Sequence, residues 1–391
     1  MAKKQVKVPA QKLAKKPASK FSSNNHINRL EIKNFKSIKN MKINPKKINI
    51  FIGKPNVGKS NVLEAISLLA GYYSTKIHSN GTQASDKYLS DFIRYENFDE
   101  LYYDGFTGNP IEIISDLCYA TIICQYNPGY HHYLIADSTD VLSFIKDEKG
   151  GNSIKNAFED YLNTWANNSK PLRITNSYQL IYPQGNVERQ DVPLSVNNPV
   201  KKFEFKKAAS FPNPYHFYLL PPHGNNLYTI VKHNKVLQKE IAAIFKEYKL
   251  DFVMKSKERV FEIQKKIKNI VTSFPYVGVA DTLQRYIFHL AAIQSNKDSV
   301  LLFEEPEAHN FPAYIRQFAE DVLADENNNQ YFITTHSPFI LNIILEKAKR
   351  EDVAVFKLDY KNYQTTAEAL SEKEIDDYLS YGTDIFFQLL K

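Results

Sequence analysis

The chain has 391 residues, of which 43% are hydrophobic and 24% are charged, so it can bury a core large enough for one big domain or two modest ones. No apolar run approaches the ~18 residues that a membrane span requires, and the first 20 residues lack the apolar segment of a secretory signal. The two cysteines are too few for a disulfide framework. We therefore expect a cytoplasmic protein rather than a membrane or disulfide-stapled one.

The formal net charge of +7 comes from the first 22 residues, which hold seven lysines and no acidic residue. Residues 1–22 are predicted to be a disordered basic tail, either solubilising or in weak, salt-sensitive contact with nucleic acid or another acidic partner. The remaining chain is formally neutral, so DNA binding stays possible but is not indicated by charge.

The predicted elements begin with two strands and a helix. Residues 28–35 alternate apolar and polar positions, as in an edge strand, and residues 47–52 form a more fully apolar strand. After Ser60, apolar residues recur at helical spacing as far as Gly71, which is placed to end the helix. Residues 23–71 are therefore predicted to be the N-terminal part of an α/β core.

Residues 72–270 are predicted to be an insertion with β-hairpins and a helical subdomain. Strand-like runs occur at residues 118–125 and 215–220, and the Lys- and Glu-rich residues 236–270 favour one or two helices. Residues 271–391 are predicted to complete the core. The elements expected there are helices at 283–294 and 312–324, strands at 299–303, 330–335 and 353–358, and a helical end.

The stretch FIGKPNVGKSN, residues 51–61, matches G-x-x-x-x-G-K-[ST] between a strand and a helix. Its glycines let the backbone turn so that N–H groups converge on phosphate oxygens, and the helix adds its dipole. Lys59 would reach the β- and γ-phosphates of ATP, and Ser60 would offer its hydroxyl to Mg²⁺. The predicted nucleotide-binding residues are Gly53, Lys54, Asn56, Val57, Gly58, Lys59, Ser60 and Asn61.

A second constellation, SVLLFEEPEAH at residues 299–309, is an apolar strand that ends in two acids. Ligands of open α/β sheets bind at the carboxyl ends of the strands. Glu304 is therefore predicted to support Mg²⁺, directly or through water, and Glu305 to orient and deprotonate the attacking water. Glu307 is predicted to be no more than an acid at a helix N-terminus.

A third strand, residues 330–335, is followed by His336, which could contact the γ-phosphate and sense its loss. Gln125, at the end of the strand at 118–125, is a further candidate for linking Mg²⁺ to a second lobe. The Asp376-Asp377 pair is isolated and is predicted to lie on a helix surface.

Three segments together resemble an ABC-type ATPase head: LEIKNFKSI at residues 30–38, the phosphate loop with NVLEAI, and the pair FEEPEAH and TTHSP. The resemblance is to the overcoming-lysogenization-defect (OLD) family, related to RecF and SMC heads, over residues 28–71 and 270–345. It implies a two-lobed α/β P-loop NTPase fold, for which we expect a mixed sheet, antiparallel β elements and an α-helical insertion. It also makes Glu304 the Walker B acid, Glu305 the catalytic glutamate and His336 the switch histidine.

The resemblance further implies ATP-dependent pairing of two heads, each site being completed by the partner's signature loop. The aligned stretch VADTLQR, residues 279–285, has Ala280 and Thr282 where a hydroxyl and a glycine are expected. A lost hydroxyl bond to phosphate would cost ~1.5–3 kcal/mol, so slow turnover is expected. Asp281 and Arg285 remain candidates there; Arg285 either compensates or is a surface helix arginine.

Many members of the family continue into a TOPRIM nuclease domain, whose Glu and Asp-x-Asp metal cluster this sequence does not show. The resemblance therefore suggests a homo-oligomer, at least a head-to-tail dimer, that regulates a separately encoded effector, possibly a TOPRIM nuclease, in anti-phage defence. Two alternatives stay open: a RecF-like DNA-repair clamp, and a slowly hydrolysing nucleotide-dependent scaffold.

Overall fold

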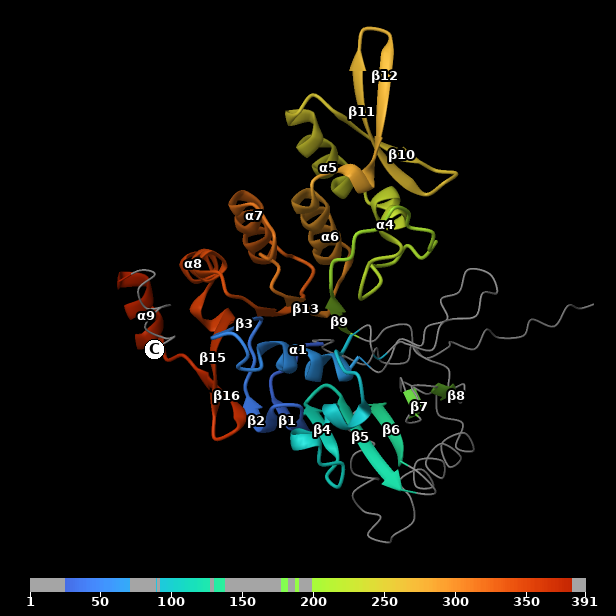
Figure 1. The fold of residues 1–391 in the computed structure, drawn as a ribbon. Helices are drawn as coiled ribbons and strands as arrows, with labels where there is room; N and C mark the ends of the chain where they lie inside the picture. Colours follow the sequence, from blue (N-terminus) through green and yellow to red (C-terminus); the bar gives the residue numbers. More distant parts are fainter. Residues whose placement is uncertain are drawn as a thin grey trace, which may run out of the picture.

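The computed structural model describes residues 25–70, 89, 92–126, 130–137, 177–181, 187–189 and 199–381. In these parts the chain forms a seven-stranded, a six-stranded and a three-stranded sheet with helices packed between and around them (Figure 1). The predicted mixed α/β class is confirmed. No helix among the described residues is long and apolar enough to cross a membrane.

The six-stranded sheet is built mainly from parallel strands, with only β16 antiparallel to its neighbour. Because parallel strands run in one direction, the carboxyl ends of β3, β14 and β13 meet at the same edge, and residues from distant parts of the sequence become neighbours there. In spatial order the strands are β16 (Gln364–Ala369), β15 (Val353–Lys361), β3 (Ile48–Gly53), β14 (Gln330–Thr334), β13 (Val300–Glu304) and β9 (Val200–Phe203).

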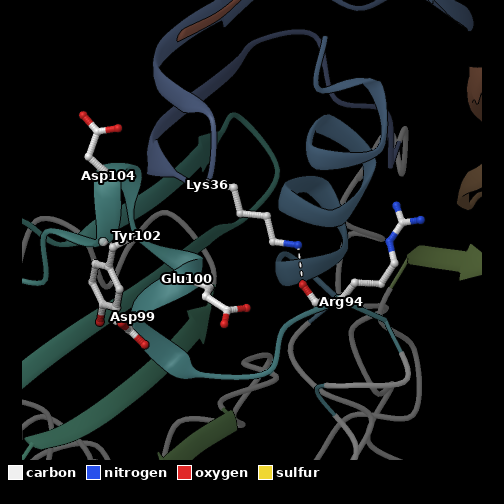
Figure 2. A pocket seen from close by; sticks show the side chains of 7 residues that line it. Lys36, Arg94, Asp99, Glu100, Tyr102 and Asp104 are labelled. Carbon is white, nitrogen blue, oxygen red and sulfur yellow. Dashed lines mark hydrogen bonds between the residues drawn. The ribbon is translucent and has the colours of Figure 1, made fainter. Parts of the chain in front are cut away.

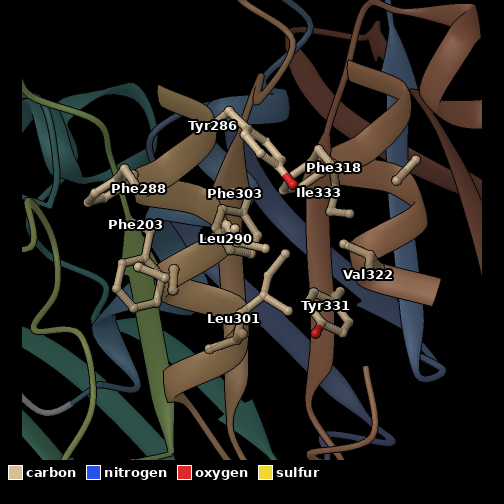
Figure 3. Close-up of a cluster of buried hydrophobic side chains, with 14 of the residues drawn as sticks. Phe203, Tyr286, Phe288, Leu290, Leu301, Phe303, Phe318, Val322, Tyr331 and Ile333 are labelled. Carbon is tan, nitrogen blue, oxygen red and sulfur yellow. The ribbon is translucent and has the colours of Figure 1, made fainter. Parts of the chain in front are cut away.

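Alternate side chains of these strands enter two different cores, as the two-residue period of a strand requires. Leu301 and Phe303 pack under the helices on one face, α6 (Asp281–Ser295), α7 (Pro312–Leu323) and α8 (Pro338–Lys347) (Figure 3). Leu302 belongs to the second core, which lies around α1 (Lys59–Leu68) on the opposite face. A sheet covered on both faces explains why its central strands are continuous apolar runs.

The seven-stranded sheet is antiparallel throughout and lies on the α1 side of the molecule (Figure 1). The prediction that residues 28–35 form an edge strand was wrong, because β1 lies between β2 and β4. Its partner β4 comes from far along the chain, and such pairing leaves no trace in local periodicity. The strands, in spatial order, are β2 (Ile38–Ile43), β1 (Leu30–Phe35), β4 (Ile111–Ser115), β5 (Tyr119–Tyr126), β6 (Tyr130–Asp137), β7 (Ser177–Ile181) and β8 (Val187–Arg189).

The third sheet projects from the body together with two helices (Figure 1). Helix was predicted across residues 236–270, but α5 ends at Glu247 and residues 251–275 form an antiparallel sheet. Phe261 and Ile263 are buried at alternate positions, which stabilises a strand even though the segment is rich in Lys and Glu. The elements are α4 (Leu227–His233), α5 (Lys235–Glu247), β10 (Asp251–Lys255), β11 (Val260–Ile267) and β12 (Ile270–Pro275).

The strand predicted at residues 215–220 is absent, and the segment is irregular. Side chains satisfy its backbone instead: Asn226 accepts from the N–H of Leu220 at 2.8 Å, and Ser295 accepts from that of Leu219 at 2.9 Å. The remaining elements are the helix α9 (Glu372–Tyr381) and the 3₁₀ turns η2 (Phe98–Leu101), η3 (Tyr103–Gly105), η4 (Tyr276–Gly278) and η5 (Arg350–Asp352).

Candidate nucleotide-binding site

The phosphate loop connects β3 to α1 and is shaped by its two glycines. Gly58 has a φ of +92°, and a Cβ at this position would lie 2.2 Å from the hydroxyl of Thr365. A Cβ at Gly53 would lie 2.5 Å from the carbonyl oxygen of Leu358. Neither position has room for a side chain, so the sequence pattern of the loop follows from its packing.

Lys59 lies inside this loop with only 5% of its surface exposed. Its Nζ donates to the carbonyl oxygens of Gly53, at 3.0 Å, and Lys54, at 2.8 Å. Burial lowers the pKa of Lys59, and the nearby carboxylates of Glu305 and Glu307 oppose that change. A fixed ammonium is therefore held where phosphate oxygens are expected.

Two turns from other parts of the chain support the loop. The hydroxyl of Thr365, in the β15–β16 hairpin, donates to the carbonyl oxygen of Val57 at 2.9 Å. Ser37, in the β1–β2 turn, lies 2.6 Å from that hydroxyl and accepts from the amide of Asn61 at 2.7 Å. Sequence reasoning missed Ser37 and Thr365, because nothing local marks residues that meet the loop only in the folded chain.

Glu304 ends β13 beside the first turn of α1. Its Oε1 accepts from Arg94 at 2.8 Å and its Oε2 lies 3.5 Å from Nζ of Lys202, while the hydroxyl of Ser60 is near enough to stabilise the ionised carboxylate. Burial opposes ionisation of Glu304, but Lys202, Ser60 and Arg94 together hold its pKa below the usual value. The carboxylate is therefore ionised at neutral pH.

The paired oxygens of Ser60 and Glu304 fit a magnesium ion, which prefers hydroxyl, carboxylate and phosphate oxygens. In the described parts of the chain, no cluster of three His, Cys, Asp or Glu side chains is positioned to hold a metal ion by itself. Phosphate oxygens of a nucleotide in the loop would supply further ligands of the kind that Mg²⁺ prefers.

Glu305 and His336 face each other beside this pair. The distance from Nε2 of His336 to Oε1 of Glu305 is 3.3 Å, and both side chains are about two-fifths exposed, 38% and 40% respectively. Glu305 has a φ of +43°, and its N–H donates to the carbonyl oxygen of Thr334 at 3.0 Å. Burial and then the charge of Lys59 lower the pKa of His336, which keeps the imidazole neutral at pH 7.

Glu307 is not at a helix N-terminus, so that prediction was wrong. The chain makes a turn after β13, with His309 at a φ of +58°, and α7 begins only at Pro312. The Oε1 of Glu307 accepts from the hydroxyl of Thr335 and from the backbone N–H of His336, each at 2.7 Å. Burial raises the pKa of Glu307 although these two donors oppose the change. Glu307 thus positions the segment that carries His336.

The remaining candidates belong to α6 and β5. The Nε of Arg285 donates to Oδ2 of Asp281 at 2.6 Å within α6, and the guanidinium lies over the ring of Phe205. The hydroxyl of Thr282 donates to the carbonyl oxygen of His309 at 3.0 Å. Gln125 lies in β5 opposite His131, but its side chain is outside the described residues, so its predicted role stays a prediction.

Asp376 lies on the surface of α9, as predicted, where it accepts from Arg350 at 3.0 Å.

Two comparisons of sequence connect this site to known proteins. Residues 277–341, which include Glu304, Glu305 and His336, match the family model described as an AAA ATPase domain. Over 344 residues the chain is 24% identical to an ATP/GTP phosphatase of Helicobacter pylori (strain ATCC 700392 / 26695), and the match covers 84% of this chain and 90% of that protein. These matches support an ATPase activity.

Among solved structures, the fold is similar to an SMC head bound to the C-terminal winged-helix domain of ScpA, with a TM-score of 0.45 and 14% identity over 90% of this chain and 99% of that one. It is also similar to an SMC head with an extended coiled coil, bound to the C-terminal domain of ScpA, from Pyrococcus furiosus. That comparison has a TM-score of 0.43 and 12% identity over 91% of this chain and 99% of the other.

Proposed function

We propose that the protein is an ATP-binding and ATP-hydrolysing head of the OLD type. Its ATP-driven assembly would regulate a separately encoded effector that acts in anti-phage defence. The observation that carries the hydrolytic part is the meeting of Lys59, Glu304, Glu305 and His336 at one edge of the six-stranded sheet. The oligomeric and effector parts rest on the resemblance of the motifs.

In this proposal each side chain at the sheet edge has one task. Lys59 and the N–H groups of the loop bind the β- and γ-phosphates. Ser60 and Glu304 would hold Mg²⁺, whose positive charge would offset the phosphate charge. Glu305 orients the attacking water and accepts its proton, while the neutral imidazole of His336 contacts the γ-phosphate.

Assembly would bring the start of α6 from a second copy to the same phosphates. Ala280 has no hydroxyl to donate, and Asp281 pairs with Arg285 inside its own helix. Without that hydroxyl a partner copy stabilises the transition state less, by ~1.5–3 kcal/mol, so slow hydrolysis is part of the proposal. A slow step suits a switch, because the assembled state persists until ATP is cleaved.

Phosphate release by the purified chain tests the hydrolytic part. Glu305→Gln should lower the rate at least about a hundredfold, because the carboxylate that accepts the proton is replaced by an amide. Arg316→Ala is the matched control, since Arg316 is an exposed side chain of α7 that forms an ion pair with Glu320 within the same helix. Equal rates for Glu305→Gln and the control would contradict the proposal.

A second candidate, the RecF-like clamp on DNA, gains support from the distribution of charge. Residues 228–278 contain eleven Lys or Arg and five Asp or Glu residues, although the chain beyond its first 22 residues is neutral. These residues form α4, α5 and the projecting three-stranded sheet (Figure 1). ATP-dependent, salt-sensitive binding of duplex ends would favour the clamp, whereas no shift of duplex DNA at low salt would exclude it.

The scaffold alternative predicts nucleotide binding without release of phosphate. It would be favoured if Glu305→Gln and the unmodified chain bound ATP equally and neither hydrolysed it. The effector part has its own test: the unmodified chain, mixed with a TOPRIM nuclease encoded beside it, should form a complex in the presence of ATP and Mg²⁺. No complex under any nucleotide condition would exclude that partner.

A further inference from the structure

Glu304 belongs to a chain of five charged groups, the other four being Arg94, Glu64, Lys36 and Lys202. On one side, Arg94 donates to Oε1 of Glu304 through its terminal nitrogen and to Oε1 of Glu64 through Nε, both at 2.8 Å. On the other side, Lys202 lies 3.5 Å from Oε2 of Glu304. Lys36 completes the group through an ion pair with Oε2 of Glu64.

Glu304, the proposed Walker B carboxylate, therefore has two cationic partners, Arg94 and Lys202. A divalent cation at Glu304 would therefore approach Arg94 and Lys202 as well as the carboxylate. At separations of a few ångströms, like charges repel strongly in a partly buried site. The metal and both of these side chains therefore cannot contact the Glu304 carboxylate at the same time.

Arg94 is the group that can leave. Its side chain is 66% exposed, whereas that of Lys202 is 2% exposed and also donates to the carbonyl oxygen of Phe92 at 2.8 Å. In Figure 2 the guanidinium of Arg94 extends away from Lys36 and Glu100, which line the pocket drawn there. The carbonyl oxygen of Arg94 accepts from Nζ of Lys36 at 2.5 Å. That backbone bond fixes the segment, so only the side chain has to move.

Departure of the guanidinium would leave neither buried carboxylate unpaired. Glu64, which is fully buried, keeps its ion pair with Lys36. Glu304 keeps Lys202 and the hydroxyl of Ser60. An uncompensated buried charge is the main cost of breaking such a network, and here that cost is avoided.

We propose that Arg94 occupies the place of Mg²⁺ at Glu304 and is displaced when the metal binds with the nucleotide. The inference rests on the proposed function, because it takes Glu304 as a metal-binding residue. Loading with Mg²⁺ and ATP then frees a guanidinium beside the phosphate loop, and loss of the metal restores the Arg94–Glu304 pair. The metal affinity is set by this competition as well as by the oxygen ligands.

The test is a binding titration that involves no turnover. A fluorescent, non-hydrolysable ATP analogue is bound to the full chain at increasing MgCl₂, and the half-saturating Mg²⁺ concentration is measured. For Arg94→Ala it should fall about fivefold or more, because the competing cation is gone. Arg94→Lys, which keeps the charge, should change it less, and Arg316→Ala should not change it.

An unchanged or higher half-saturating concentration in Arg94→Ala would overturn the proposal, since Arg94 would then be neutral or would help the metal to bind. If Arg94→Ala fails to fold, Arg94→Gln replaces it and must show the same fall. A chain that binds no analogue at any Mg²⁺ concentration would instead overturn the proposed function, and the two failures are therefore distinguishable.

Discussion

The backbone N–H of His336 donates to the carboxylate of Glu307 at 2.7 Å, so an acid that follows β13 holds the end of β14. The same oxygen accepts from the hydroxyl of Thr335. His336 in turn lies 3.3 Å from Glu305, the residue two positions before Glu307. The turn after one strand and the end of the next therefore form one rigid unit around the proposed catalytic pair.

Removing this support should impair catalysis more than binding. Glu307→Ala is expected to lower kcat about tenfold and to leave the KM for ATP nearly unchanged, because Glu307 positions His336 and touches no phosphate. Glu307→Gln keeps an oxygen acceptor and should retain most of the activity. Steady-state phosphate release measures both constants. A rise in KM with kcat unchanged would mean that Glu307 acts in binding.

The phosphate loop should not tolerate a side chain at Gly58. Gly58→Ala combines a φ of +92° with a contact of 2.2 Å to Thr365, so we expect a loss of about 2 kcal/mol or more in the free energy of unfolding, together with loss of nucleotide binding. Gly105→Ala is the matched control, since Gly105 has a φ of +68° and no described atom within 4 Å of the added Cβ.

The control separates backbone strain from crowding. Gly105→Ala should lose only about 1 kcal/mol in urea unfolding and should bind a fluorescent ATP analogue normally. If both alanine variants lost stability equally and both kept nucleotide binding, the packing of Gly58 against Thr365 would not matter to the site.

A buried histidine under the sheet should make the protein less stable in mild acid. His289 lies among Phe288, Phe303 and Phe318, and burial, followed by the charge of Arg285, lowers its pKa to about 3. The unfolded chain has the usual value near 6.5, so it binds a proton first as the pH falls. The free energy of unfolding therefore decreases as the pH falls below 6.5, and the contribution of His289 to this decrease ends at about pH 3.

From pH 7 to pH 5, His289 alone should lower the free energy of unfolding by about 2 kcal/mol. His289→Leu removes the titrating group, so its urea unfolding should depend less on pH by that amount, whatever its absolute stability. The same loss between pH 7 and pH 5 in both proteins would show that other groups cause the acid sensitivity.

The sequence predicted the parts of the site that lie at strand ends. Glu304, Glu305 and His336 lie at or just after the ends of apolar strands, Lys59 lies after the loop that follows another such strand, and parallel strands bring these ends to one edge. The motif spacing was therefore enough to predict which of these side chains meet. The structure places Nε2 of His336 3.3 Å from Oε1 of Glu305 at this edge.

What the sequence did not predict depends on contacts between segments far apart in the chain. Arg94 and Lys202 reach Glu304 from two other segments, and no local pattern marks either as part of the site. Glu64 is a charged residue among the buried, mostly apolar side chains of α1, and this is the one feature that could have pointed to a buried ion pair. In residues 251–275, a composition rich in Lys and Glu concealed the alternation of Phe261 and Ile263 that stabilises a strand.

We propose that ATP assembles the protein and that hydrolysis, which depends on Glu305, ends the assembled state. The most direct measurement is the solution mass, by light scattering, of the unmodified chain and of Glu305→Gln after addition of ATP and Mg²⁺. Glu305→Gln should stay in a heavier, ATP-containing species, whereas the unmodified chain should return to its starting mass as ATP is consumed. A mass that does not change with ATP in either protein would contradict it.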